Sequence, residues 1–270
     1  HCAALIQVGD SVRNPASFYE TNIAGSLNLL EEMRLHQISH VIFSSTAAVY
    51  GASQSGLIGE NTPLQPVNPY GNTKLAVENM IRDFSNAYGL KYAILRYFNA
   101  AGADPQNETG TAYKKDTHLV PLLMQVAAGL KPFIEVFGAD YPTPDGTAMR
   151  DYIHVTDLAV AHVLALRHSL EMGGNMNLNL GTDKGHSVSE IIAAARRITG
   201  KAIPVSHCDR RSGDPPVLVA DAAQARQLLH WQPQYSDLDT ILGTAWAWRQ
   251  KQSILYGSAL TRRALTQRAA

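Results

Sequence analysis

The segment from residue 14 to residue 97 alternates between helical and extended patterns, and this alternation constrains the fold more than any other feature. Asn14-Pro15 and Asn68-Pro69 each place a good N-cap before a proline that suits the first helical turn. The apolar run Val41 to Phe43 and the stretch 91–97 are expected to form strands buried on both faces. Helix, strand, helix, strand is typical of a doubly wound parallel sheet, so we predict an α/β fold.

Composition agrees with this class and argues against several partners. The chain has 270 residues, of which 45% are hydrophobic and 17% charged, and Lys+Arg equal Asp+Glu at 23 each. Such a balance produces no strong field, so we expect neither nucleic acid nor a membrane as a partner. The apolar runs are too short for a membrane span and no leader pattern is visible, which favours a cytoplasmic protein with reduced Cys2 and Cys208. The histidines and cysteines lack metal-ligand spacing, so we predict no metal site.

Polar side chains that could take part in proton transfer end the strand at residues 41–46 and begin the helix after Pro69. Tyr70 and Lys74 are four residues apart, on one helix face, and an ammonium near a phenol lowers the tyrosine pKa from about 10. Such a tyrosine can exchange a proton with a substrate hydroxyl. The pair alone is weak evidence, but Ser44, Ser45 and Thr46 end the preceding strand at the edge where open α/β sheets bind ligands. A hydroxyl, a tyrosine and a lysine in this arrangement resemble the catalytic set of the extended short-chain dehydrogenase/reductase family, and this resemblance implies Tyr70, Lys74 and Thr46 as catalytic residues.

Five segments together resemble the extended short-chain dehydrogenase/reductase family, and within it the epimerases that act on UDP-sugars. They are residues 1–4, 43–51, 69–74, 96–99 and 138–154. The resemblance implies NAD as cofactor and interconversion of UDP-glucose and UDP-galactose, as in galactose metabolism. The sugar would be oxidised at C4 to a 4-keto intermediate and reduced again on its opposite face.

The resemblance also implies a domain organisation. A partial Rossmann-type doubly wound parallel sheet would bind NAD, and a smaller α/β domain would bind the UDP-sugar. The implied NAD-binding domain comprises residues 1–98 and 151–181, the UDP-sugar-binding domain residues 99–150 and 182–252, and the tail residues 253–270.

Twelve residues stand at positions that contact the cofactor in that family. Ile6 departs from a frequent lysine, which puts a phosphate contact there in doubt. Asn22 equally suits a buried amide bonded to backbone, Phe98 suits simple core packing, and the two serines suit strand-end hydrogen bonds. The implied NAD contacts are Cys2, Ala3, Ala4, Leu5, Ile6, Thr21, Asn22, Ser44, Ser45, Tyr70, Lys74 and Phe98.

A second set matches contacts to a UDP-sugar. Arginine forks suit the diphosphate, a carboxylate suits a ribose hydroxyl, and the strand 135–137 would lie along uracil. His118 departs from an asparagine found in some epimerases, and an unaided Arg-Arg-Ser-Gly-Asp loop is more often a solvated turn. The implied substrate contacts are Thr46, Tyr70, Asn99, His118, Leu119, Glu135, Val136, Phe137, Arg150, Arg211, Asp214 and Leu218.

Several alternatives remain open. A 4,6-dehydratase would need a carboxylic acid after Thr46, where this chain has Ala47. A UDP-pentose or UDP-N-acetylhexosamine 4-epimerase would keep the same catalytic residues. The resemblance further implies that about 80 residues with a glycine-rich phosphate-binding turn precede His1. The 270 residues alone would then be an inactive sugar-nucleotide-binding fragment, which neither retains NAD nor epimerises UDP-galactose. The full-length protein would form a homodimer.

Overall fold

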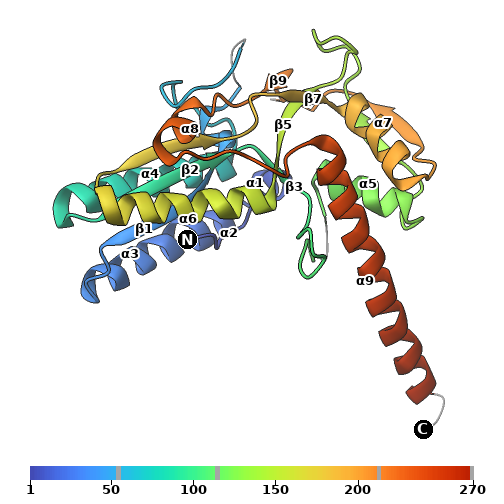
Figure 1. Cartoon of the computed structure of the whole chain (residues 1–270), viewed down its shortest axis with the longest axis horizontal. Coiled ribbons are helices and arrows are strands. Elements are labelled where there is room, and N and C mark those ends of the chain that lie inside the picture. Colours follow the sequence, from blue (N-terminus) through green and yellow to red (C-terminus); the bar gives the residue numbers. More distant parts are fainter. Residues whose placement is uncertain (53–55, 113–115, 212–213, 268–270) are drawn as a thin grey trace.

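The computed structural model describes residues 1–52, 56–112, 116–211 and 214–267, with side chains as far as residue 253. A three-stranded parallel sheet in the order β1-β2-β6 forms the centre of the first part of the molecule, which is built mainly from residues 1–97 and 155–180 (Figure 1). Because the strands are parallel, their carboxyl ends share one edge, where Thr46 of β1 and Tyr97 of β2 are register partners. The predicted α/β class is confirmed. The strands are β1 (His40–Thr46), β2 (Lys91–Tyr97) and β6 (Met176–Leu180).

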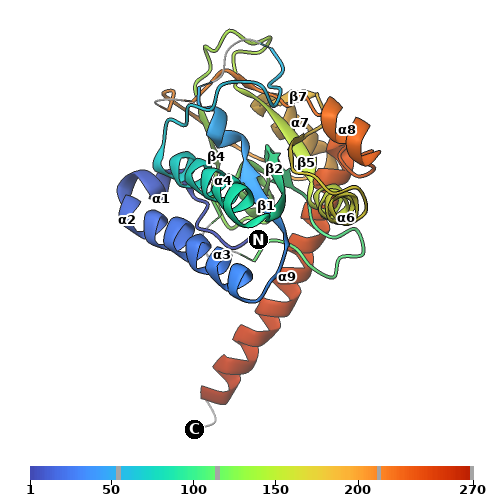
Figure 2. The ribbon, with the colours of Figure 1, turned by 90° about the vertical axis from the view of Figure 1, so that its left-hand side faces the viewer.

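Helices cover both faces of this sheet, with α3 and α4 on one side of β1 and α6 on the other (Figure 2). Side chains of a strand alternate between faces, so Val41 and Phe43 pack with α3 and α4 whereas Ile42 packs with α6. The helical elements around the sheet are α1 (Val8–Arg13), α2 (Pro15–Phe18), the π-helical turn η1 (Tyr19–Ala24), α3 (Gly25–Leu35), the 3₁₀ turn η2 (Ala47–Tyr50), α4 (Pro69–Tyr88) and α6 (Val155–Met172).

Helix α4 begins and ends where its sequence signals lie. The Asn68 side chain accepts a hydrogen bond from Gly71 N at 2.9 Å, and Pro69 occupies the first turn. Gly89 ends the helix in the left-handed conformation, with φ of 75°. The similar Asn14-Pro15 signal is only half confirmed, because Pro15 begins α2 but the Asn14 side chain makes no capping bond.

The second part of the chain surrounds two smaller sheets. One has the order β3-β5-β7, with β9 also paired to β5, and the other pairs β4 with β8. An apolar core between α5, α7 and α9 includes Leu123, Ile191 and Leu242 (Figure 1). The strands are β3 (Asn99–Ala101), β4 (Ile134–Phe137), β5 (Met149–His154), β7 (Gly185–Ser187), β8 (Val205–Cys208) and β9 (Val217–Leu218). The helices of this part are α5 (Leu119–Ala127), α7 (Val188–Thr199) and α9 (Leu238–Gln267). Helix α8 (Ala223–Leu229) instead packs against α6 and β6 of the central sheet.

Helix α9 extends away from the rest of the molecule in both ribbon views (Figures 1 and 2). It continues to Gln267, so most of the segment predicted as a tail is helical; residues 268–270 lie outside the described residues. None of the helices that the structure describes combines the length and apolar composition needed to cross a bilayer.

Candidate active site

The first turn of α4 lies directly against the end of β1. Gly71 makes this approach possible, since a Cβ at this position would come within 2.7 Å of Ala48 O in η2. The neighbouring Tyr70 is consequently buried, with 9% of its surface exposed. At the end of β1, the Thr46 hydroxyl oxygen accepts a hydrogen bond from Ala48 N at 3.1 Å, which orients this side chain. The structure thus brings the predicted phenol and hydroxyl to the same edge of the sheet.

Lys74 lies one turn further along α4 and is almost completely buried. Its Nζ donates to Ser44 O at 2.9 Å and lies 4.8 Å from the centre of the Phe43 ring. Burial lowers its pKa from 10.5 to about 8, although Cys2 and Glu78 act to raise it. A lysine whose pKa lies this close to neutrality is typical of functional sites.

This depressed pKa makes folding stability depend on pH. Between pH 8 and 10.5 the unfolded chain binds the Lys74 proton more tightly than the folded chain, so stability should rise with pH. The rise from this group should reach about 3 kcal/mol, and Lys74→Met should remove it. Urea denaturation of both proteins at a series of pH values measures the difference. Parallel curves for the two proteins would contradict the assignment.

The first residues of the chain border the same edge. His1 lies beside β1, because its backbone nitrogen donates to Ile42 O at 2.7 Å and its carbonyl accepts from Ser44 N at 3.2 Å. The Ser44 hydroxyl lies 3.1 Å from Cys2 Sγ. Cys2 and Ala3 are exposed and small, and Lys74 has two further N–H donors besides the one given to Ser44 O. These groups fit a dinucleotide, because the accessible segment of small residues leaves room for it. The ammonium of Lys74 beside this segment can hold ribose hydroxyls.

Asn22, by contrast, is bonded to backbone as the simpler interpretation expected. Its Oδ1 accepts from Leu5 N at 2.8 Å, and its Nδ2 donates to Leu5 O at 3.0 Å and to Thr73 Oγ1 at 3.0 Å. Thr21 is exposed on the π-helical turn η1 and Ile6 is half-buried. Asn22 therefore joins the N-terminal segment to α4 and fixes its path past the sheet.

Ser45 and Ser44 lie on opposite faces of β1. Strand alternation turns Ser45 toward α4, where its hydroxyl donates to Glu78 Oε1 at 2.6 Å. Ser44 faces the α6 side, where its hydroxyl lies 3.2 Å from His162 Nε2. His162 Nδ1 donates to Leu158 O at 2.7 Å, so Nε2 is the acceptor of the Ser44 hydrogen bond. Of the two serines, Ser44 alone remains next to the proposed NAD contacts.

The predicted substrate residues form two neighbouring groups. Arg150 and Leu218 are register partners on β5 and β9, and Arg150 Nη2 lies 3.5 Å from Asp214 Oδ1. Arg211 lies over the ring of Phe137, at 3.7 Å from its centre. Asp214 N also donates to Arg211 O at 3.2 Å, which joins the two groups. Two guanidinium groups, a carboxylate and an aromatic ring are thereby presented on adjoining elements.

The remaining predicted contacts range from buried to exposed. Asn99 Nδ2 donates to Asp151 O at 3.0 Å, and Phe98 packs with Leu218 against η2. Glu135 is exposed and Val136 is buried on β4. His118 is the exposed N-cap residue of α5, and Leu119 packs against the core of the second part.

Asp151 is a buried acidic residue next to Arg150 that the sequence analysis did not single out. Its fully buried carboxylate accepts hydrogen bonds from Thr182 N at 3.0 Å, Thr182 Oγ1 at 2.8 Å and Ala220 N at 3.2 Å. Burial raises its pKa to about 6 despite these donors. It ties β5 to the end of β6 and to the chain after β9. The only local signal was its place beside Arg150.

Glu78 and Arg96 were missed as well. Both are buried and paired with each other, Arg96 Nη2 lying 2.6 Å from Glu78 Oε2. An arginine within the apolar pattern of β2, and a glutamate four residues after Lys74, were the available signals. Among the described residues no cluster of three or more histidine, cysteine or acidic side chains is arranged to hold a metal ion.

Comparison with known proteins agrees with this geometry. The model of the NAD dependent epimerase/dehydratase family matches residues 1–181. A UDP-glucose 4-epimerase of Halalkalibacterium halodurans is 46% identical over 251 residues, covering 93% of this chain and 75% of that protein. The crystal structure of UDP-glucose 4-epimerase from Brucella ovis in complex with NAD is 51% identical with a TM-score of 0.88, covering 90% of this chain and 75% of that one.

A second solved structure extends the comparison. A UDP-glucose-4-epimerase from Stenotrophomonas maltophila, with bound NAD and formylated UDP-arabinopyranose, is 41% identical with a TM-score of 0.90 and covers 94% of this chain and 76% of that one. The family match spans more than half of the chain and includes β1, α4 and β2. The chain belongs to the NAD dependent epimerase/dehydratase family.

Proposed function

We propose that the protein interconverts UDP-glucose and UDP-galactose by an NAD-dependent reaction at C4 of the sugar, a step of galactose metabolism. The observation that carries this proposal is the placement of Tyr70 and Lys74 on one face of α4 against the end of β1, which bears Thr46. Relatives of known name support it, since the Halalkalibacterium halodurans protein is a UDP-glucose 4-epimerase and the Brucella ovis structure contains NAD.

We assign the two ligands to the two parts of the chain. Residues 1–98 and 151–181 would hold NAD through the segment at Cys2 to Leu5 and through Lys74. Residues 99–150 and 182–252 would hold the UDP-sugar. Bound NAD would supply the acceptor, and later the donor, of the hydrogen and electron pair at C4.

The side chains would move and hold the proton. Tyr70 accepts the proton of the C4 hydroxyl as the carbon is oxidised, and returns it to the C4 oxygen after the 4-keto sugar has turned over. The Lys74 ammonium on the same helix face favours the phenolate form of Tyr70. The Thr46 hydroxyl hydrogen-bonds the same oxygen. One proton and one hydrogen with its electron pair leave the sugar and both return, so the reaction is an isomerisation.

The second part would bind the nucleotide end. Arg150 and Arg211 would neutralise the diphosphate with their planar forks, and the uracil would lie along Phe137. Asp214 could exchange its contact with Arg150 for a ribose hydroxyl. Asn99, fixed by Asp151 O, would offer its amide oxygen to the sugar or diphosphate.

An isotope experiment tests this function directly. NAD-loaded protein is incubated with UDP-galactose deuterated at C4, and the products are followed by NMR. We expect a mixture of UDP-galactose and UDP-glucose that retains deuterium at C4, because hydrogen removed from that carbon returns to it. Solvent hydrogen at C4 would contradict the mechanism. UDP-sugar binding without turnover would instead favour a sugar-nucleotide-binding protein without catalysis.

Leu218 supports a second candidate, a broader epimerase that also accepts N-acetylated sugars. It is half-buried beside Phe98 and η2. A bulkier side chain at this position would narrow the space for the substituent at C2 of the sugar. Leu218→Tyr should lower turnover of UDP-N-acetylgalactosamine at least about tenfold and that of UDP-galactose less than about threefold. Leu218→Met, which conserves volume, is the matched control. A rate on the N-acetylated sugar that survives Leu218→Tyr would refute the gating role.

One comparison supports a UDP-pentose as an additional substrate. The Stenotrophomonas maltophila structure holds a formylated UDP-arabinopyranose, and its chain is 41% identical to this one. The same assay with UDP-xylose decides whether this protein also acts on a pentose.

We further propose that the protein forms a homodimer in the cytoplasm. Leu27 and Leu35, exposed on one side of α3, support a second copy. Cys2 and Cys208 are free thiols, which supports a reducing compartment. Sedimentation velocity at several concentrations distinguishes a dimer from a monomer.

A further inference from the structure

α4 covers one face of the central sheet, and most side chains on this face are apolar. One row of three neighbouring residues across the strands is polar instead. Ser45, Arg96 and Asn179 are register partners on β1, β2 and β6, and their exposures are 1%, 2% and 0%. Two positions earlier on the same face, Phe43 and Ile94 belong to the apolar core. A buried guanidinium is costly unless it is paired and hydrogen-bonded, so this row needs a counter-charge from the helix above it.

Glu78 of α4 supplies that charge. It follows Tyr70 and Lys74 at intervals of four residues, and so lies on the same helix face. Arg96 donates to both of its oxygens, from Nε at 2.9 Å and from Nη2 at 2.6 Å, and Ser45 Oγ donates to Oε1 at 2.6 Å. Burial acts to raise the pKa of Glu78, but these donors and the charge of Arg96 outweigh burial and lower it. The carboxylate is therefore held ionised and in one orientation.

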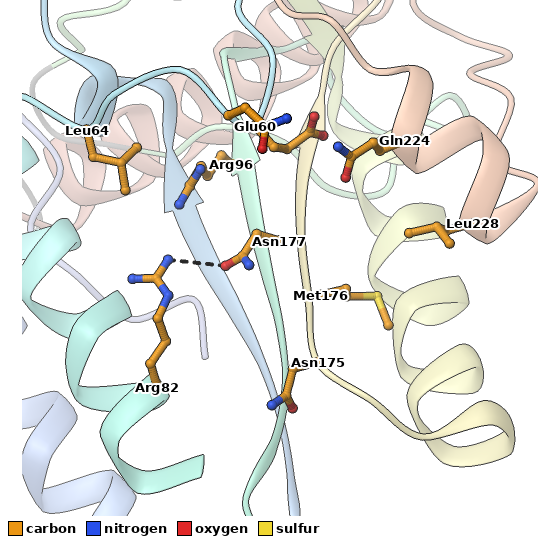
Figure 3. A pocket seen from close by; sticks show the side chains of 10 residues that line it. Glu60, Leu64, Arg82, Arg96, Asn175, Met176, Asn177, Gln224 and Leu228 are labelled. Atoms are coloured by element: carbon orange, nitrogen blue, oxygen red, sulfur yellow. Dashed lines mark hydrogen bonds between the residues drawn. The ribbon is translucent and has the colours of Figure 1, made fainter. Parts of the chain in front are cut away.

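Further bonds extend this arrangement across the sheet. Arg96 Nη1 donates to Tyr50 OH at 3.0 Å, and Tyr50 OH donates to Asn179 Oδ1 at 2.7 Å. On the outer side, Arg82 Nη2 donates to Glu78 Oε2 at 2.8 Å. The same nitrogen donates to Asn177 Oδ1 at 3.2 Å (Figure 3). The network thus joins α4 to all three strands and to η2.

The outer side of the network opens on a polar pocket of about 420 Å³ beside β6 and α8 (Figure 3). Arg82, Arg96, Asn177 and Glu60 line it, whereas Tyr70 and Thr46 do not. This pocket is therefore separate from the proposed catalytic edge. The inner side of the network, at Ser45, is sealed from solvent.

Consecutive residues of β1 meet consecutive turns of α4. Ser44 O accepts from Lys74, and Ser45 Oγ donates to Glu78, immediately before Thr46. We propose that Glu78 is a positioning residue: held by Arg96 and bonded to Ser45, it fixes α4 along β1 and thereby sets Tyr70 and Lys74 relative to Thr46. This inference rests on the proposed function. Misplacement of a reacting group by about 1 Å can cost about 10²-fold in rate.

Ser45→Ala tests the proposal, because it removes the hydrogen bond between Glu78 and β1 but leaves the Glu78–Arg96 pair and the bond from Lys74 to Ser44 O intact. In NAD-loaded protein we expect kcat for UDP-galactose to fall about tenfold, with KM within about twofold of the wild-type value. Thr199→Ala is the matched control, since it removes a buried hydroxyl that donates to Ala195 O in α7. It should leave both constants within about twofold.

A double-mutant cycle separates positioning from a general loss of structure. If Ser45 acts through the placement of Tyr70, Ser45→Ala should cost less than about twofold in a Tyr70→Phe background. Glu78→Gln should lower kcat more than Ser45→Ala does, and Glu78→Asp should lower it less than Glu78→Gln. If Glu78→Gln does not fold, Ser45→Ala still tests the proposal. A Ser45→Ala kcat within twofold of wild type, or the same tenfold loss in both backgrounds, overturns the positioning role. A wild-type protein that epimerises no UDP-sugar overturns the proposed function instead.

Discussion

Tyr70→Phe should reduce epimerase turnover at least about 100-fold while leaving UDP-sugar binding nearly unchanged. Phenylalanine conserves the packing of a side chain that is 9% exposed, so the helix start and the Gly71 contact with η2 should persist. The group that is lost is the one that would accept and return the C4 proton. A defect confined to the chemical step would therefore lower kcat and kcat/KM equally, with little effect on the affinity for UDP.

The measurement compares kcat from the NMR assay with the Kd of UDP from calorimetry. Tyr88→Phe, on the same helix but exposed, is the matched control and should behave as wild type. A Tyr70→Phe turnover within tenfold of wild type would show that another group transfers the proton. A large rise in the Kd of UDP would show that the substitution disturbs the binding site as well.

Arg96→Met should produce the largest loss of stability, about 3–5 kcal/mol, because it leaves the Glu78 carboxylate buried without its main partner. Glu78 is fully buried, and burial strongly penalises an unpaired charge. Arg82 also contacts Glu78, but it is partly exposed and sits on the outer side, so it replaces little of the lost interaction. Methionine fills comparable volume, which limits the effect to charge and hydrogen bonding.

Urea denaturation of wild type and variant measures this loss. Arg197→Met is the control, because Arg197 pairs with Asp239 on the surface with both side chains exposed, and such pairs contribute little. Equal small shifts for the two variants would mean that water enters the Glu78 site and compensates the charge. A Glu78→Gln plus Arg96→Met double variant that recovers stability would support the stated cause.

Local signals in the sequence were sufficient to predict the elements that form the proposed catalytic edge. Asn68 and Pro69 define the start of α4, and the apolar run before Ser44 defines β1, because a cap and a buried strand are set by a few adjacent residues. Parallel pairing then brings Thr46 and the first turn of α4 to one edge. The segment predicted as a tail continues α9 as far as Gln267, an extension of the helix that the sequence pattern does not indicate.

Side-chain pairing between distant segments could not be read in this way. Ser45 was grouped with Ser44 as a cofactor contact, but strand alternation turns it toward Glu78. The bond from Asp151 to Ala220 and the pair of Arg96 with Glu78 depend on the full three-dimensional packing. Periodicity reports which face is buried but not which buried polar groups meet, so these residues emerged only from the structure.

The double hydrogen bond between Asn22 and Leu5 limits which amino acids position 22 can accept. The amide presents an acceptor and a donor to the Leu5 backbone, as a neighbouring peptide group would, and a second donor bond to Thr73. Aspartate offers acceptors but no donor, glutamine is one methylene too long, and alanine leaves buried backbone groups unpaired. A saturation library should thus retain asparagine almost alone here, whereas the adjacent exposed Thr21 should tolerate wide replacement.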